Sequence, residues 1–74
     1  MTLLHHVDPA RRMWRFYRVR LAADLFGQTT VLREWGSIGS PGKVRVDVMM
    51  DAAAAEAWHA RLLRGKLRKG YTEL

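Results

Sequence analysis

The sequence contains no cysteine in 74 residues. Neither a disulfide framework nor a thiolate zinc site can form, and the three histidines have no spacing that would replace thiolate ligands. No apolar run approaches the roughly 20 residues that span a bilayer, and the first residues carry no basic lead before an apolar stretch. We therefore expect a soluble, cytoplasmic protein with no metal centre and no membrane contact.

Acidic residues are also scarce. Seven Asp and Glu stand against 13 Lys and Arg, which gives a formal net charge of +6, and the calculated pI is about 10.8. A charge of this sign and size indicates a polyanionic partner such as a nucleic acid. Because arginine outnumbers lysine and alanine is abundant, codon bias remains an alternative source of part of this charge.

The sequence also lacks a recognisable constellation for hydrolysis or group transfer. No carboxylates converge in sequence and no serine lies in a nucleophile elbow. His5 and His6 are adjacent, so on an extended chain their side chains point apart, whereas His59 is typical of a core histidine bonded to a backbone acceptor. We expect neither an enzyme nor a bound cofactor.

The chain is short enough to form one domain, residues 1–74, with room for one sheet and one helix. Residues 1–13 show no periodicity and are expected to form an irregular arm. Residues 14–50 contain the predicted strands, residues 51–69 the predicted helix and residues 70–74 a C-terminal tail. This order predicts an α+β fold, an antiparallel sheet with one C-terminal helix across one face.

The first two predicted strands form a hairpin. In residues 15–22 apolar side chains occupy the odd positions from Tyr17 onward, while Arg18 and Arg20 share the other side. Residues 24–27 supply turn chemistry, and the run that follows, to Trp35, is rich in β-branched and aromatic residues.

The third predicted strand has the most regular alternation in the chain. Val44, Val46 and Val48 alternate with Lys43, Arg45 and an aspartate. The glycine-rich loop before it has no Lys-Ser/Thr at P-loop spacing, and no helix follows at once. We therefore interpret that loop as a tight connection and not as a phosphate cradle.

The predicted helix is capped at both ends and is amphipathic. Asp51 is expected to cap a run of four alanines, and Gly70 is expected to end the helix after Lys69. The apolar face is predicted to hold Ala52, Ala55, His59, Leu62 and Leu63. The opposite face carries a basic stripe that includes Arg61 and Arg64.

These patterns place a basic surface on the side of the sheet away from the helix. We expect the helix to cover the valine side of the third strand and Leu32 of the second, which leaves the alternate positions open. The residues expected on the open face are Trp35, Arg33, Lys43, Arg45, Arg18 and Arg20. Guanidinium groups grip phosphates and an indole stacks on a sugar or base, so this surface suits nucleic acid. The alternative is that the charged residues only occupy the solvent-exposed side of the sheet, as in any antiparallel sheet, and that Trp35 covers its edge.

Six segments of the sequence resemble the WGR domain family, in particular its stand-alone bacterial members. The segments are Asp8-Pro9-Ala10-Arg11, Arg15-Phe16-Tyr17-Arg18, Asp24-Leu25-Phe26-Gly27, Arg33-Glu34-Trp35-Gly36, Ile38-Gly39-Ser40-Pro41-Gly42 and Lys69-Gly70-Tyr71. The resemblance covers residues 8–72, and the family's Trp-Gly-Arg motif stands here as Trp35-Gly36-Ser37. It implies a small twisted antiparallel sheet with one long helix across it, and a further strand near residues 1–7 or 71–74.

The resemblance also implies a function. In the WGR modules of poly(ADP-ribose) polymerases, the motif tryptophan stacks against the sugar at a DNA 5′ end and neighbouring basic residues contact the phosphates. On this chain Trp35 is the implied stacking residue and Lys43 and Arg45 the implied phosphate contacts, while Ser37 cannot replace the motif arginine. We expect a non-enzymatic module that binds DNA, with a preference for ends or breaks. The alternative is a protein–protein adaptor that binds an acidic partner.

Overall fold

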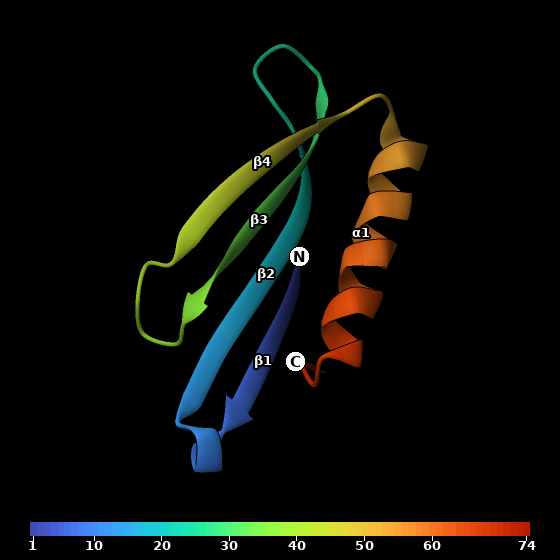
Figure 1. Ribbon diagram of the computed structural model, residues 1–74. Helices are drawn as coiled ribbons and strands as arrows, with labels where there is room; N and C mark the ends of the chain where they lie inside the picture. The colour runs from blue at the N-terminus through green and yellow to red at the C-terminus, as the bar shows by residue number, and fades with distance from the viewer.

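The structure is a computed structural model that describes residues 1–74 as an open antiparallel sheet with one helix across one face (Figure 1). The elements are β1 (Thr2–Asp8), the 3-10 turn η1 (Pro9–Arg11), β2 (Met13–Ala23), β3 (Thr29–Ser37), β4 (Lys43–Met49), α1 (Ala52–Arg68) and β5 (Thr72–Glu73). The five strands lie in the order β4-β3-β2-β1-β5. The predicted α+β class is confirmed. The helix does not have the length and apolar content needed to cross a membrane.

The expectation of an irregular N-terminal arm is wrong, because most of that segment is β1. β1 pairs with β2 along its whole length, and its buried residue Leu4 is fully enclosed. β5 pairs with the other side of β1, with Leu4 opposite Glu73, and the Leu74 amide donates a hydrogen bond of 2.9 Å to the Leu3 carbonyl. The further strand that the family resemblance implied is thus found at both suggested places. Backbone pairing on both sides stabilises β1 although its sequence does not alternate.

The helix begins and ends close to the predicted residues. Asp51 accepts a hydrogen bond of 2.8 Å from an amide of the first turn, as an N-cap residue does. At the other end Gly70 has φ of 102°. The amides of Gly70 and Tyr71 donate bonds of 3.1 Å to the carbonyls of Leu67 and Lys66, the pattern of a Schellman motif. This motif stops the helix and directs the chain into β5.

The core is small and lies between the helix and the central strands. Its fully or almost fully buried members are Leu4, Tyr17, Val19, Val31 and Ala55. Trp58, Leu62 and Leu63 of the helix pack against them. Ala52, predicted on the apolar face, is exposed. His59 lies 3.1 Å from the Thr2 hydroxyl and not against a backbone acceptor as expected.

The prediction of which side chains face the helix is right for β2 and wrong for β3. Tyr17 and Val19 lie under the helix, as expected, which leaves Arg18 and Arg20 on the opposite face. The register pairs Tyr17 with Trp35 and Val19 with Arg33. Directly paired residues point to the same face of a sheet, so Arg33 and Trp35 also lie under the helix. The cause is that β3 buries Val31 and not Leu32.

The predicted side of β4 is wrong for the same reason. Val44, Val46 and Val48 are 59%, 55% and 58% exposed on the open face, and the register puts Lys43 and Arg45 on the helix side with Trp35 and Arg33. The helix packs mainly against β2 and β3, so the edge strand β4 meets it only at its margin. The polar side chains of β4 therefore lie on the helix side at this margin, and its valines face solvent.

One carboxylate connects β3, β4 and the helix at this margin. Asp47 forms an ion pair of 2.9 Å with Arg33 and accepts hydrogen bonds of 3.0 Å from both the Trp58 indole and Arg45. The side chains of Arg33 and Asp47 are only 16% and 15% exposed. Burial raises the pKa of Asp47, but the Trp58 hydrogen bond and the Arg33 and Arg45 guanidinium groups together lower that pKa below its ordinary value of 3.8.

The two valine environments give a matched test of strand parity. Val31 is fully buried, so Val31→Thr should lower the free energy of unfolding by about 1–3 kcal/mol, because it places a hydroxyl in the core. Val46→Thr keeps the β-branched shape on an exposed surface, so the change should stay within about 0.5 kcal/mol. Urea denaturation of both variants measures the difference. Equal losses would contradict the assigned faces.

The Asp47 network should make stability depend on acid. The folded-state pKa of Asp47 lies below the unfolded value of 3.8, so the folded state takes up a proton less readily. The contribution of the carboxylate is therefore fully present above that value and is lost as the pH falls through the folded-state pKa. Asp47→Asn should cost about 1–3 kcal/mol at pH 7, and the deficit should shrink below pH 4. Thermal melts from pH 2 to 8 measure it; a deficit independent of pH would refute this role.

Candidate nucleic-acid interface

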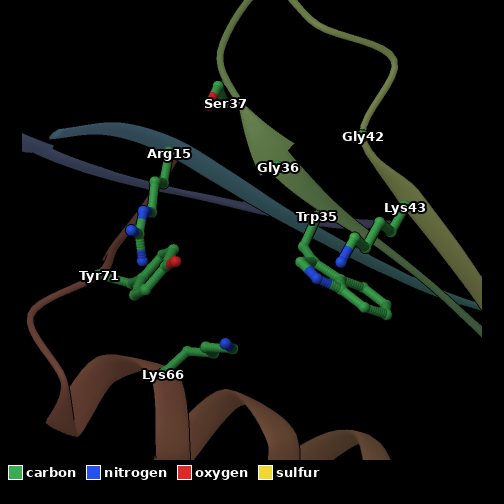
Figure 2. A pocket seen from close by; sticks show the side chains of 8 residues that line it. All are labelled: Arg15, Trp35, Gly36, Ser37, Gly42, Lys43, Lys66 and Tyr71. Carbon is green, nitrogen blue, oxygen red and sulfur yellow. The ribbon is translucent and has the colours of Figure 1, made fainter.

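A cleft of about 620 Å³ opens between the C-terminal part of the helix and one end of the sheet. The sheet, the loop between β3 and β4, the helix and the segment after it all contribute lining residues. These are Arg15, Trp35, Gly36, Ser37, Gly42, Lys43, Lys66 and Tyr71. Figure 2 shows Arg15 beside Tyr71 on one flank, Trp35 beside Lys43 on the other, and Lys66 extending between them from the helix. Pockets of a few hundred Å³ accommodate one small ligand or a single nucleotide.

The loop from β3 to β4 forms one wall by packing closely on the strand backbone. Gly42 has φ of 75°, and a Cβ at this position would clash with the Trp35 carbonyl oxygen and lie 2.9 Å from the Phe16 ring. A Cβ on Gly36 would lie 2.7 Å from the Gly42 Cα. The loop is closed by Ser40, whose hydroxyl donates a hydrogen bond of 2.8 Å to the Ser37 carbonyl. The prediction of a tight connection is confirmed.

The cleft is cationic. Arg15, Lys43 and Lys66 line it, and no carboxylate does. The Lys66 ammonium lies 4.6 Å from the centre of the Tyr17 ring and 5.2 Å from that of Tyr71. Burial lowers the pKa of Lys66, and the nearby charges of Lys69, Arg33 and Arg15 lower it further. An anion in the cleft would relieve this repulsion between like charges.

Trp35 is held in position by the Asp47 network. The Arg33 guanidinium lies between two indoles, 6.0 Å from the Trp35 ring and 5.7 Å from the Trp58 ring. Asp47 fixes this guanidinium, which lies within cation–π distance of the Trp35 ring. Arg33 is therefore a positioning residue and is too enclosed to contact a phosphate itself.

A smaller cavity of about 240 Å³ lies against the inner side of Trp35. It is lined by Tyr17, Arg33, Trp35, Leu62 and Lys66, so Trp35 and Lys66 belong to both spaces. The Tyr17 phenol oxygen is buried and has no hydrogen-bond partner within the protein. Burial raises the pKa of this phenol, so it remains a neutral hydrogen-bond donor at ordinary pH.

The structure divides the six predicted interface residues between two faces. Trp35, Arg33, Lys43 and Arg45 lie together on the helix side, and of these Trp35 and Lys43 line the cleft. The expectation that all six share the open face is wrong because of the strand parity described above. Arg18 and Arg20 are the two on the far face, where Arg18 lies over the Phe16 ring at 5.6 Å.

Three lining residues escaped sequence reasoning: Arg15, Lys66 and Tyr71. A signal existed for Arg15, which has the same parity on β2 as Tyr17. A signal existed for Lys66 as well: it follows Leu62 by one helical turn and so lies on the inner face of the helix. The position of Tyr71 depends on the Schellman turn and on its stacking with His6, at 5.1 Å between ring centres.

Comparison with known proteins places the chain in a family. The model of the WGR domain family matches residues 1–74. The chain is 35% identical over 68 residues to "Uncharacterized protein y4dW" of Sinorhizobium fredii (strain NBRC 101917 / NGR234), an alignment that covers 92% of this chain and 33% of that protein. The chain thus spans about a third of the length of this relative. No solved structure matches. Because the family model matches residues 1–74, the chain belongs to the WGR domain family.

Proposed function

We propose that this WGR domain binds DNA, without catalysing a reaction, in the cleft between α1 and the end of the sheet. The observation that carries the proposal is the composition of the cleft, an indole surrounded by three cationic side chains and no carboxylate. WGR domains are associated with nucleic-acid binding in proteins related to poly(ADP-ribose) polymerases. The net charge of +6 supports the same class of partner.

The shape of the cleft favours the end of a strand over the interior of a duplex. It lies at one end of the sheet and is bounded on two flanks, with Arg15 and Tyr71 on one and Trp35 and Lys43 on the other (Figure 2). A terminal nucleotide can enter such a space and stack on an indole, whereas a continuous duplex cannot fold into it. We infer a preference for DNA ends or breaks.

Each lining side chain then has a role. Trp35 is the stacking residue, and Arg15, Lys43 and Lys66 neutralise phosphate. Arg45 lies two residues from Lys43 on the same face, and its side chain is 66% exposed, so it is placed to contact the next phosphate along the strand. Ser37 takes the place of the motif arginine at the rim, which leaves hydrogen bonding but no charge at that point.

Trp35→Ala tests stacking. The substitution should weaken binding to linear duplex DNA by roughly 1–3 kcal/mol, the range of one aromatic stacking contact, and should leave binding to closed circular DNA almost unchanged. The matched control is Trp14→Ala, since Trp14 is about half exposed and lies on the opposite face of the sheet. Fluorescence anisotropy with linear and circular competitors measures both. Thermal melts must first show that each variant is folded, because Trp35 also contacts the core.

If folded Trp35→Ala protein kept the same preference for linear over circular DNA, the proposed stacking role would be wrong. If instead the parent protein bound an acidic polypeptide more tightly than any DNA, the adaptor function would replace the one proposed here.

Lys43→Ala tests the cationic part of the cleft. It should weaken binding to linear duplexes, whose ends can enter the cleft, and reduce the slope of log affinity against log salt on those duplexes by about one unit, because one phosphate contact is lost. Arg20→Ala removes the same charge from the far face and should leave the slope nearly unchanged. Equal slopes for the two variants would show that binding depends on net charge and not on the cleft.

A further inference from the structure

β4 presents a long unpaired edge. The sheet begins with β4, which pairs only with β3. None of the backbone hydrogen bonds outside helices and strands involves residues 43–49. At the opposite edge β5 has only two residues, which pair with the middle of β1 and interrupt that edge. β4 has seven and contains neither proline nor glycine, the residues that commonly interrupt an edge strand.

The sequence of β4 is complementary to itself in one antiparallel register. The strand runs from Lys43 to Met49, so its midpoint is Val46. Pairing two copies with Val46 opposite Val46 overlaps all seven residues. It also places Val44 opposite Val48 twice and Arg45 opposite Asp47 twice.

The neighbouring registers are less favourable. A shift that centres the pair on Arg45 puts two guanidinium groups directly opposite each other, and a shift to Asp47 does the same with two carboxylates. A shift to Val44 sets Arg45 against Lys43. Like charges directly opposite are destabilising, whereas opposite charges and β-branched pairs each contribute roughly 0.2–1 kcal/mol.

The side chains on both faces agree with this register. The three valines are more than half exposed on the open face, where they would otherwise form an unexplained apolar row on an edge strand. Arg45 is 66% exposed and so can extend toward the second copy, although it already contacts its own Asp47, which is 15% exposed, at 3.0 Å.

We propose that two copies of this chain associate through β4, antiparallel and centred on Val46, to form one continuous sheet. The contact has two-fold symmetry, so each copy uses the same surface and the assembly closes as a dimer. Directly opposed residues point to the same face, so both helices lie on one side of the joined sheet. Lys43 of each copy lies opposite Met49 of the other, which places the two clefts at opposite ends of the paired strands.

Cysteine scanning tests the register, and the chain has no native cysteine to interfere. Val46→Cys should form a disulfide-linked homodimer under mild oxidation, because residues directly opposite have Cβ atoms about 4.5–5.5 Å apart. Val44→Cys alone and Val48→Cys alone should not, since each is four residues, or about 13 Å, from its own counterpart. A mixture of these two variants should form the linked heterodimer.

This pattern distinguishes the proposal from random collision. Equal crosslinking of Val44→Cys alone, Val48→Cys alone and their mixture would overturn the register, and so would failure of Val46→Cys to link. All three positions are exposed on the same face, so each variant serves as a control for the accessibility of the others.

Sedimentation equilibrium tests the association itself. The parent protein should be a dimer at high concentration in about 1 M salt, where the Debye length is about 3 Å and repulsion between two highly cationic copies is screened. Val46→Lys should be monomeric, because it sets two ammonium groups face to face. Ala22→Lys adds the same charge to the same face two strands away and should still dimerise. A parent protein that stays monomeric, or equal dimerisation of both variants, would overturn the proposal. DNA binding plays no part in these measurements.

Discussion

The fold depends on the contact between Asp47 and Arg33. The core has few buried side chains, and the edge strand β4 has none of them. Asp47 connects β4 to the helix. Its carboxylate accepts hydrogen bonds from Trp58 and Arg45 and forms an ion pair with Arg33. Such a pair is stable only when the remaining hydrogen-bonding capacity is satisfied, and removal of one partner leaves the other charged and buried. A thin core is in this way extended by a polar layer.

The same contact organises the cleft. Arg33 is paired with Asp47 and lies 6.0 Å from the centre of the Trp35 ring, so the position of this partly buried indole depends on a carboxylate on the neighbouring strand. Rigid support of this kind matters for stacking, because a freely rotating indole would lose conformational entropy on binding. The cationic side chains are organised differently. Lys43 and Lys66 have no salt-bridge partner, so their charge remains available to a ligand.

Local patterns predicted most of the fold, and the two errors of strand parity share one physical cause. The helix with its Asp51 cap and the strand parity around Tyr17 followed from spacing and capping chemistry. The parity of β4 did not, because its valine row has the composition of a buried row. The register between β3 and β4 decides which face of β4 is buried. Val31 lies opposite Asp47, so Asp47 faces the helix, and its partners Arg33 and Trp58 come from other elements of the fold. Strand alternation and the resemblance to WGR domains predicted Trp35 and Lys43 as site residues, but the face on which they lie and their neighbours on the helix required the register.

The pairing of β5 with β1 has a consequence for protein engineering. These two strands, the first and last of the chain, lie side by side and antiparallel, with Leu4 opposite Glu73. The marks for the chain ends lie close together in Figure 1. Segments joined to the two ends would therefore leave from neighbouring points, as is required of a module that is spliced into an exposed loop of a host protein or circularly permuted. The edge that would carry such a graft is the one farthest from β4.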